Sequence, residues 1–233
     1  MSAAASLRQL RYAPASWLWV GLVLGTQTLL AGAGGPDGIP GWFVSLGLSR
    51  AGFLSGHIWQ IASYGLVHGS WWHAAINALL VLLIGARIEH ITGGRTMWLT
   101  TLAGVVGGGL CHLLLGSGLL VGLSGGCMAL LLLATTLSPQ SRMLPLPVSG
   151  RSLGLGLLLA ALILTLLNPA LGVPGACRLG QWLSARGLGG WFQIGHACHL
   201  GGGLAGWLYG RGLLRAPATL RHLHRARARR EAS

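Results

Sequence analysis

The sequence has little charge, and almost none of it is negative. Only 8% of the 233 residues are charged, whereas soluble domains carry about 25%. Three residues are acidic, Asp37, Glu89 and Glu231, and all sixteen basic residues are arginines. This composition excludes an ordinary soluble domain, and the long apolar stretches of the chain contain no carboxylate.

Cysteine is also scarce. The four cysteines lack the spacing of metal ligands, and three of them lie inside apolar runs: they are Cys111, Cys127, Cys177 and Cys198. Free thiols in such runs behave as small apolar side chains. We therefore expect neither a disulfide nor a metal site, and no cofactor.

Six long apolar runs dominate the chain. The sequence is 52% hydrophobic with a mean hydropathy of +0.65, and the runs occupy residues 15–33, 66–88, 96–116, 119–137, 151–170 and 189–210. Each approaches the ~20 residues that a helix needs to cross ~30 Å of hydrocarbon. Lipid offers no hydrogen-bond partners to an open backbone, and strand-like alternation is not visible. The sequence therefore predicts an all-α polytopic membrane protein with six transmembrane helices.

The arginines are distributed unevenly between the two faces of such a bundle. Thirteen of the sixteen would lie on one face, leaving Arg50, Arg178 and Arg186 on the other. Arginine bias marks the cytoplasmic side, so both termini are expected in the cytoplasm. The predicted organisation is a short basic N-terminus (1–14), one membrane domain (15–210) and a basic tail (211–233). Positive charge beside helix ends indicates anionic lipid as a partner, and not nucleic acid.

Several polar side chains interrupt the apolar runs. They are His68, His73 and Asn77 in the second run, Ser124 in the fourth, and His196 and His199 in the sixth. Ionisable residues inside membrane spans are candidates for function. Because the second, fourth and sixth helices would run in the same direction, four of these positions fall at similar depth in the outer half of the bilayer. They are His73, Asn77, Ser124 and His199. An alcohol, an imidazole and further donors at one depth suit acyl transfer.

Each of these residues alone has a simpler interpretation. A lone serine in a membrane helix usually bonds to the carbonyl four residues earlier, and a lone histidine or asparagine commonly bridges two helices. A haem protein with His73, His112 and His199 as ligands would explain the histidines, but it leaves Ser124 and Asn77 unexplained. The coincidence of all these groups at one depth favours catalysis.

The same residues form ordered motifs. The second run contains H-x4-H-x3-N, the fourth contains G-x-S-G, and Gly195, His199, Gly202 and Gly206 recur in the sixth. In this order, over about residues 55–210, the motifs resemble those of the rhomboid family of intramembrane serine proteases. They do not separate general rhomboids from the rhombosortase branch, which processes C-terminal sorting tails.

The resemblance implies a Ser–His dyad that cleaves peptide bonds in membrane-embedded protein substrates. Ser124 would be the nucleophile and His199 the general base, and the oxyanion would be stabilised by His73, Asn77 and the N–H groups of Leu123 and Ser124. Structural support would come from His68, Gly122, Gly125, Gly195, Gly202 and Gly206. We expect an integral protein of a bacterial inner membrane with its site open to the outer face. A catalytically silent rhomboid-like protein that binds transmembrane segments is the alternative.

Two positions depart from the family pattern. Met128 replaces the aromatic residue that often stacks on the catalytic histidine, and Gln60 replaces the arginine usual after Trp59. We expect looser orientation of the histidine from the first change and weaker anchoring of the outer loop from the second. The glycines around His199 favour it as the base, whereas His196 is expected at the rim, satisfied by water or a headgroup.

Overall fold

A computed structural model of the protein describes residues 10–142 and 147–215. Parts of the predicted basic N-terminus and tail, residues 1–9 and 216–233, lie outside the described residues. The structure is 78% helical, and the described residues contain no β-strand beyond two isolated bridges, Leu48 with Leu120 and Arg142 with Ser149. The predicted all-α class is confirmed.

Seven helices make up the main body of the described chain. They are α2 (Pro14–Gly32), α7 (Trp71–Leu80), α8 (Ala86–Thr92), α9 (Gly94–Leu115), α10 (Ser124–Leu137), α11 (Gly150–Leu167) and α13 (His196–Arg215). A π-helical turn, Val81–Gly85, joins α7 to α8 in one continuous helix. The shorter elements are α3 (Gly35–Gly38), α4 (Pro40–Leu46), α5 (Arg50–Leu54), α6 (Gln60–Ser63), α12 (Ala176–Leu183) and the turns Pro169–Leu171, Ser184–Leu188 and Gly189–Gln193.

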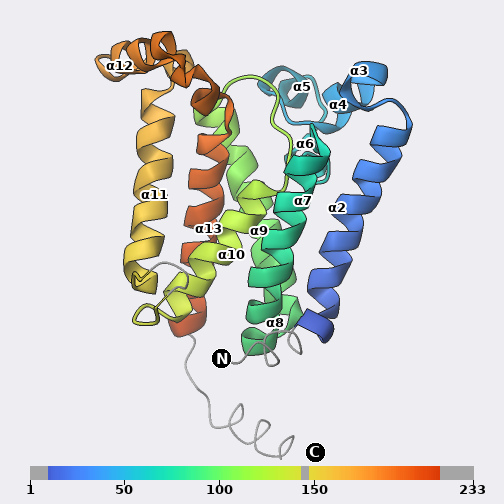
Figure 1. Cartoon of the computed structure of the whole chain (residues 1–233), viewed down its shortest axis with the longest axis vertical. Helices are drawn as coiled ribbons and strands as arrows, with labels where there is room; N and C mark the ends of the chain where they lie inside the picture. The colour runs from blue at the N-terminus through green and yellow to red at the C-terminus, as the bar shows by residue number, and fades with distance from the viewer. Residues whose placement is uncertain (1–9, 143–146, 216–233) are drawn as a thin grey trace, which may run out of the picture.

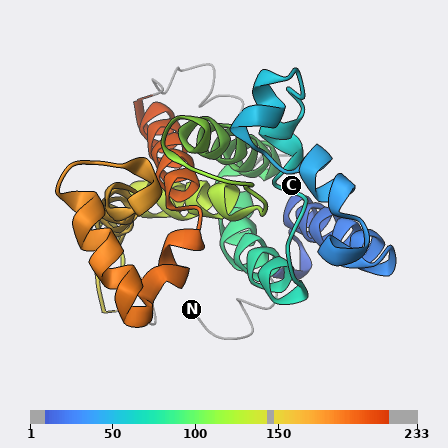
Figure 2. The ribbon, with the colours of Figure 1, turned by 90° about the horizontal axis from the view of Figure 1, so that it is seen from above.

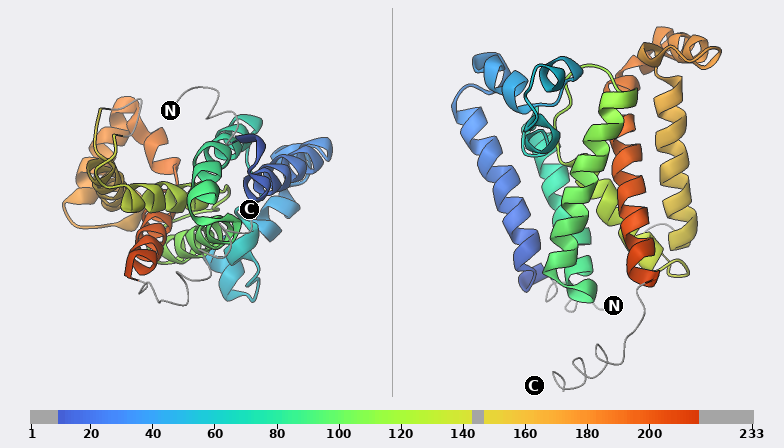
Figure 3. Two further views of the ribbon diagram at one scale, coloured as in Figure 1. Left: turned by 90° about the horizontal axis from the view of Figure 1, so that it is seen from below. Right: turned by 180° about the vertical axis from the view of Figure 1, so that it is seen from behind.

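The long helices stand side by side in a bundle, and the short helices α3 to α6 and α12 gather at one end (Figure 1). We call this end, at the top of Figure 1, the upper end. The start of α2 and the end of α13 lie at the lower end. Seen from above, α9, α10 and α13 occupy the middle, with α2 and α11 at opposite margins (Figure 2). The view from behind shows α9 packed beside α13 (Figure 3).

Within the part of the chain that the structure describes, four helices are long and apolar enough to cross a membrane, judged by length and composition. They are α2, the continuous helix Trp71–Thr92, α9 and α11. Helix α10 is apolar but has only 14 residues. Helix α13 has 20 residues and ends in a segment that contains Arg211 and Arg215. Those four helices therefore have the length and the apolar composition that a bilayer crossing requires.

Three helices begin later than their apolar runs predicted. They begin at Trp71, Ser124 and His196, and not at residues 66, 119 and 189. The residues before these helices are apolar but not in α-helical conformation; Leu120, for example, exchanges two backbone hydrogen bonds with Leu48. The predicted boundaries were wrong because hydropathy records apolar character and not backbone conformation.

Gln60 anchors the chain between α2 and α7. Its side chain is fully buried. Its oxygen accepts a hydrogen bond from the Ser49 N–H at 3.3 Å, and its nitrogen donates to the Val44 carbonyl at 2.8 Å. The neighbouring Trp59 donates from its ring nitrogen to the Ser45 carbonyl. The loop is thus anchored without the usual arginine, because a glutamine amide supplies both a donor and an acceptor.

Glycines bring the central helices into backbone contact. A β-carbon built on Gly202 would lie 2.8 Å from the Cα of Gly125, and one on Gly206 would lie 2.5 Å from the Cα of Ala129. Both glycines belong to α13, and the atoms they approach belong to α10. Small residues at such spacing allow membrane helices to pack closely. The distance between α10 and α13 is thus set by the absence of side chains at these positions.

We predict that Gly206→Ala destabilises the protein and that Gly212→Ala does not. Both positions lie in α13, but a β-carbon at Gly212 meets no other atom within 4 Å. Crowding against the α10 backbone is expected to cost about 1–3 kcal/mol, whereas alanine in an open helical position is as good as glycine or better. Thermal unfolding of the two variants in one detergent tests this. Equal midpoints for both variants would contradict close packing at Gly206.

Candidate active site

The segment before α10 carries Ser124 into the bundle. Leu120 donates to and accepts from the backbone of Leu48, at 2.8 and 2.9 Å. The Gly122 N–H donates to the Tyr64 carbonyl at 2.9 Å, and the Leu123 N–H donates to Nε2 of His68 at 3.3 Å. Four hydrogen bonds therefore fix the backbone immediately before Ser124, which is the first residue of α10.

Gly122 is required by both its conformation and its neighbour. Its φ of 111° lies in the region that favours glycine. A β-carbon there would also lie 2.5 Å from Cε1 of His73. The first glycine of the G-x-S-G motif therefore adopts a backbone conformation that other residues disfavour, and it leaves room for the His73 ring.

Ser124 and His199 lie within hydrogen-bonding distance. The Ser124 Oγ is 2.9 Å from the His199 Nε2, although the two residues are far apart in sequence and belong to α10 and α13. His199 lies in the first turn of α13, and its N–H donates to the Gly195 carbonyl at 3.0 Å. Both helices thus present their first turns to one another.

Tyr64 packs where α9, α10 and α13 meet. Its side chain is fully buried, and its hydroxyl donates to the Val105 carbonyl at 2.7 Å. The same oxygen lies 3.5 Å from Sγ of Cys198. A β-carbon on Gly125 would lie 2.8 Å from that sulfur and 3.3 Å from the tyrosine oxygen. The second glycine of the G-x-S-G motif therefore leaves space for the side chains that hold the helices together.

The amide of Asn77 is held in one orientation. Its Nδ2 donates to the His73 carbonyl at 3.2 Å, and its Oδ1 accepts from the thiol of Cys127 at 3.5 Å. A second hydrogen remains on Nδ2, and this nitrogen lies 3.6 Å from the position of a β-carbon on Gly122. Asn77 can therefore direct one N–H toward the serine segment.

His68 is engaged at both ring nitrogens, so its position is structural. Its Nδ1 lies 3.2 Å from the Leu66 carbonyl, and its Nε2 accepts from Leu123. This ring is fully buried and meets the His73 ring edge-on, with centroids 4.9 Å apart. The Leu123 N–H, expected to face an oxyanion, donates to this ring in the structure, and its role as an oxyanion donor stays a prediction.

The N–H of Ser124 takes a different position from that of Leu123. It is the first N–H of α10, and the first N–H groups of a helix have no acceptor within the helix. In the described ranges 10–142 and 147–215, it forms no hydrogen bond to a backbone or side-chain acceptor. It is therefore available as a donor beside its own hydroxyl.

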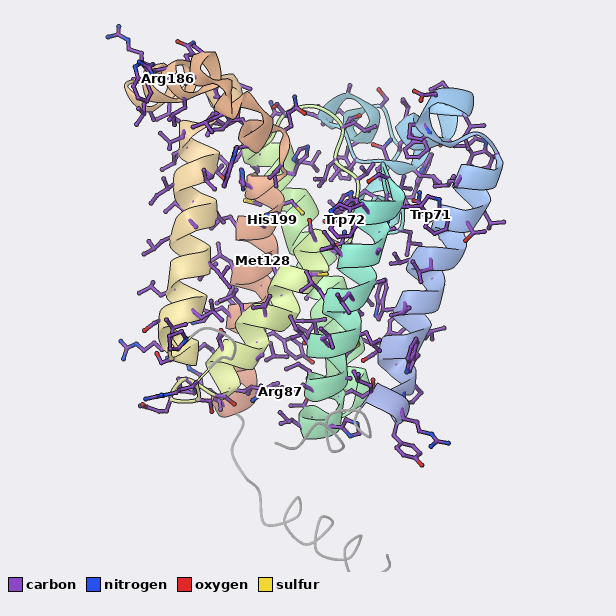
Figure 4. The ribbon with its side chains drawn as sticks, in the orientation of Figure 1. Trp71, Trp72, Arg87, Met128, Arg186 and His199 are labelled. Carbon is purple, nitrogen blue, oxygen red and sulfur yellow. The ribbon has the colours of Figure 1, made fainter. Side chains whose placement is uncertain are left out.

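A cavity of about 880 Å³ contains these groups. Its lining includes Ser124, His199, His73, Asn77 and Met128, and also His112, Ser117, Thr165, Asn168, Phe192, Gln193, Ile194 and His196. Figure 4 shows Met128 close to His199 in the middle of the bundle. No carboxylate lines the cavity among the described residues. Glu89 instead accepts hydrogen bonds from the N–H groups of Ala15 and Ser16 at the lower end.

His196 is buried and bonded to the protein, and not at a wet rim. It is only 8% exposed, and its Nε2 lies 2.8 Å from the Trp191 carbonyl. Its ring meets that of His199 edge-on, with centroids 5.9 Å apart. The expectation that water or a headgroup satisfies His196 is wrong, because the chain folds back over it as the turn Gly189–Gln193.

Three contributors to this site were not identified from the sequence. Tyr64, Cys127 and Asn168 each make a polar contact that positions a neighbouring element; Asn168, for example, donates to the Phe192 carbonyl at 3.3 Å. A tyrosine or asparagine at the edge of an apolar run is a weak signal by itself. Cys127 lies three residues after Ser124, on the next turn of α10, but a thiol there resembles any small apolar residue.

The arrangement has the chemical requirements of acyl transfer. A hydroxyl lies beside an imidazole nitrogen that can accept its proton. The N–H groups of Asn77 and Ser124 and the ring of His73 surround the same space, where developing negative charge could be stabilised. Among the described residues no group of three or more His, Cys, Asp or Glu side chains could hold a metal ion.

The comparison with protein-family models gives one match, to the rhomboid domain over residues 55–216. The matched range begins before α6, and it contains α7 to α13 and every residue that lines the cavity. No curated protein matches the chain. Members of the matched family are generally intramembrane serine proteases, and the four long apolar helices agree with an integral membrane protein. This chain belongs to the rhomboid family.

Proposed function

We propose that this protein is an intramembrane serine endopeptidase with Ser124 as nucleophile and His199 as general base. The observation that carries the proposal is the 2.9 Å separation of Ser124 Oγ and His199 Nε2 within a large cavity. A serine that only satisfied its own helix would bond to a carbonyl four residues earlier. This serine is the first residue of its helix and faces an imidazole from another helix.

In the proposed reaction the Ser124 oxygen attacks the scissile carbonyl while His199 takes the hydroxyl proton. The carbonyl oxygen becomes an oxyanion, which accepts hydrogen bonds from Asn77 Nδ2, the Ser124 N–H and the His73 ring. His199 then gives its proton to the leaving amine, and the acyl-enzyme remains. A water molecule, deprotonated by His199, releases the acyl group and restores the hydroxyl of Ser124.

Packing must orient His199 in this scheme, since no carboxylate of residues 10–142 or 147–215 lines the cavity. In other serine enzymes an acid holds the imidazole. Here the His196 ring lies edge-on against it, and Met128 lines the same cavity. His196 is itself fixed by the Trp191 carbonyl. We therefore assign to His196 a positioning role. Its ring partly replaces the aromatic residue that the family often has at the position of Met128.

The proposed topology has six membrane-crossing helices and both termini in the cytoplasm. Helices α10 and α13 would join the four helices that are long and apolar enough alone. The described arginines support this orientation: the lower end carries seven, Arg11, Arg87, Arg95, Arg142, Arg151, Arg211 and Arg215, and the upper end only three. The site would then open to the outer face of a bacterial inner membrane, and substrates would be proteins with transmembrane segments.

We predict that a fluorophosphonate probe labels the wild-type protein in detergent and that Ser124→Ala abolishes labelling. The probe reports a serine whose hydroxyl is activated by a base. Ser117→Ala is the matched control, because Ser117 lines the same cavity. Labelling that persists in Ser124→Ala would remove the proposal, and a folded wild type that is never labelled would favour the silent, substrate-binding alternative.

The two histidines of α13 are expected to differ in their effects. His199→Ala removes the proposed base, so cleavage of a transmembrane substrate is expected to fall to background. His196→Ala keeps the base but loses the ring that packs on it, and we expect reduced but measurable cleavage. Rates of cleavage in proteoliposomes check both variants. An inactive His196→Ala variant together with an active His199→Ala variant would reverse the assignment of the general base.

Asn77→Ala is expected to slow cleavage without abolishing it. Removal of one oxyanion donor typically lowers kcat by a factor on the order of 10²–10³, and Ser124 N–H and His73 would remain. The measurement is kcat and KM together with thermal unfolding of the variant. A normal kcat would exclude Asn77 from the oxyanion site. A decrease in kcat that is caused by unfolding would be accompanied by a lower unfolding midpoint.

A further inference from the structure

Helix α12 lies across the upper end of the bundle, beyond the end of α11 (Figure 1). Helix α11 has 18 residues, a length of about 27 Å at ~1.5 Å per residue, and the hydrocarbon core is ~30 Å thick. Gly180 of α12 fits against the Leu167 carbonyl at the end of α11. Figure 2 shows that α12 extends away from the centre of the bundle. A helix so placed lies at the level of the lipid headgroups.

The exposed side chains of α12 suit a membrane interface. Leu179 is 48% exposed and Trp182 is 50% exposed. The guanidinium of Arg186 lies 3.6 Å from the centre of the Trp182 ring, and Figure 4 shows Arg186 at the upper extremity of the molecule. Tryptophan beside arginine is typical of the headgroup region, and apolar and basic residues together are typical of interfacial helices.

Two positive charges on this segment are available for a ligand. Of the three arginines at the upper end, Arg50 is engaged, since it donates to the carbonyls of Leu113 and Leu114. Arg178 and Arg186 form no hydrogen bond and no ion pair with the part of the chain that the structure describes. The described acids are remote: Asp37 is in α3 across the upper end, and Glu89 is at the lower end.

We propose that residues 176–188 form an interfacial anchor that binds anionic phospholipid headgroups through Arg178 and Arg186. Leu179 and Trp182 contact the boundary of the acyl chains, and the two guanidinium groups contact headgroup phosphates. Lipid is the occupant that the position requires, because the segment extends from the end of a membrane-length helix over the surrounding bilayer. Anionic headgroups complement a segment that carries two arginines without an ion pair and no acid.

The anchor is mechanically connected to the wall of the cavity. Asn168, at the end of α11, donates to the Phe192 carbonyl, and Phe192 and Ile194 line the cavity that holds Ser124. The segment that follows the anchor therefore forms part of the cavity wall. We therefore expect the charge of the headgroups to influence cleavage, and this expectation rests on the proposed protease function. Binding of the headgroups does not rest on that function.

The test compares the full chain in nanodiscs of phosphatidylcholine alone and of phosphatidylcholine mixed with phosphatidylglycerol. Amide hydrogen exchange is followed by mass spectrometry. We expect residues 176–188 to exchange more slowly with the anionic lipid, by about fivefold for each arginine. The double variant Arg178→Gln/Arg186→Gln is expected to lose this difference. Residues 50–63 are the internal control, because their arginine is already bonded to α9.

A second measurement reports the depth of the helix. Lipids with brominated acyl chains are expected to quench Trp182, detected as the difference in quenching between wild type and Trp182→Phe. Equal exchange in the two lipids, an unchanged difference in the double variant, or an equal response of residues 50–63 would overturn the proposal. Protection by soluble glycerol phosphate would also overturn it, since it would indicate a free phosphate site. All these readouts are independent of catalysis, so they hold even if the chain cleaves nothing.

Discussion

Extended backbone can lie inside a helical bundle only if its peptide groups find partners there. The segment that precedes α10 satisfies this constraint with bonds to Leu48, Tyr64 and His68, each from the chain between α2 and α7. An unpaired peptide group in such a place costs several kcal/mol. The position of Ser124 therefore depends on a loop that is distant in sequence, and that loop depends in turn on the buried amide of Gln60.

The second condition for the site is the close approach of two helix starts. Side chains between α10 and α13 would hold Ser124 and His199 apart. Gly202 and Gly206 instead let the two backbones meet, and the first turns of both helices then lie within reach of each other. Glycine is a poor helix former in water, but in these helices the packing that it permits is worth more than the propensity that it loses.

The sequence was sufficient to predict the helical class and to single out polar residues that line the cavity. Ser124, His199 and Asn77 could be identified because polar groups are conspicuous in apolar runs and their spacing was ordered. The contacts that position them could not be predicted, although His68 was expected as structural support. Tyr64 and His68 make contacts that depend on how a loop folds into the bundle, and hydropathy carries no information about that. The predicted helix starts were wrong for the same reason, because leucine is equally apolar in extended backbone and in a helix.

The cavity has no acid among the described residues, and this affects the balance of charge during the proposed reaction. When the proton moves from the hydroxyl to the imidazole, the site acquires one cation and one anion but no resident counter-charge. In a medium of low dielectric constant two opposite charges a few ångströms apart stabilise each other strongly, and each alone is costly. The imidazolium and the oxyanion are therefore each other's counter-ions. Both must form together and be neutralised together, so the tetrahedral species is an internal ion pair that leaves the net charge of the cavity unchanged.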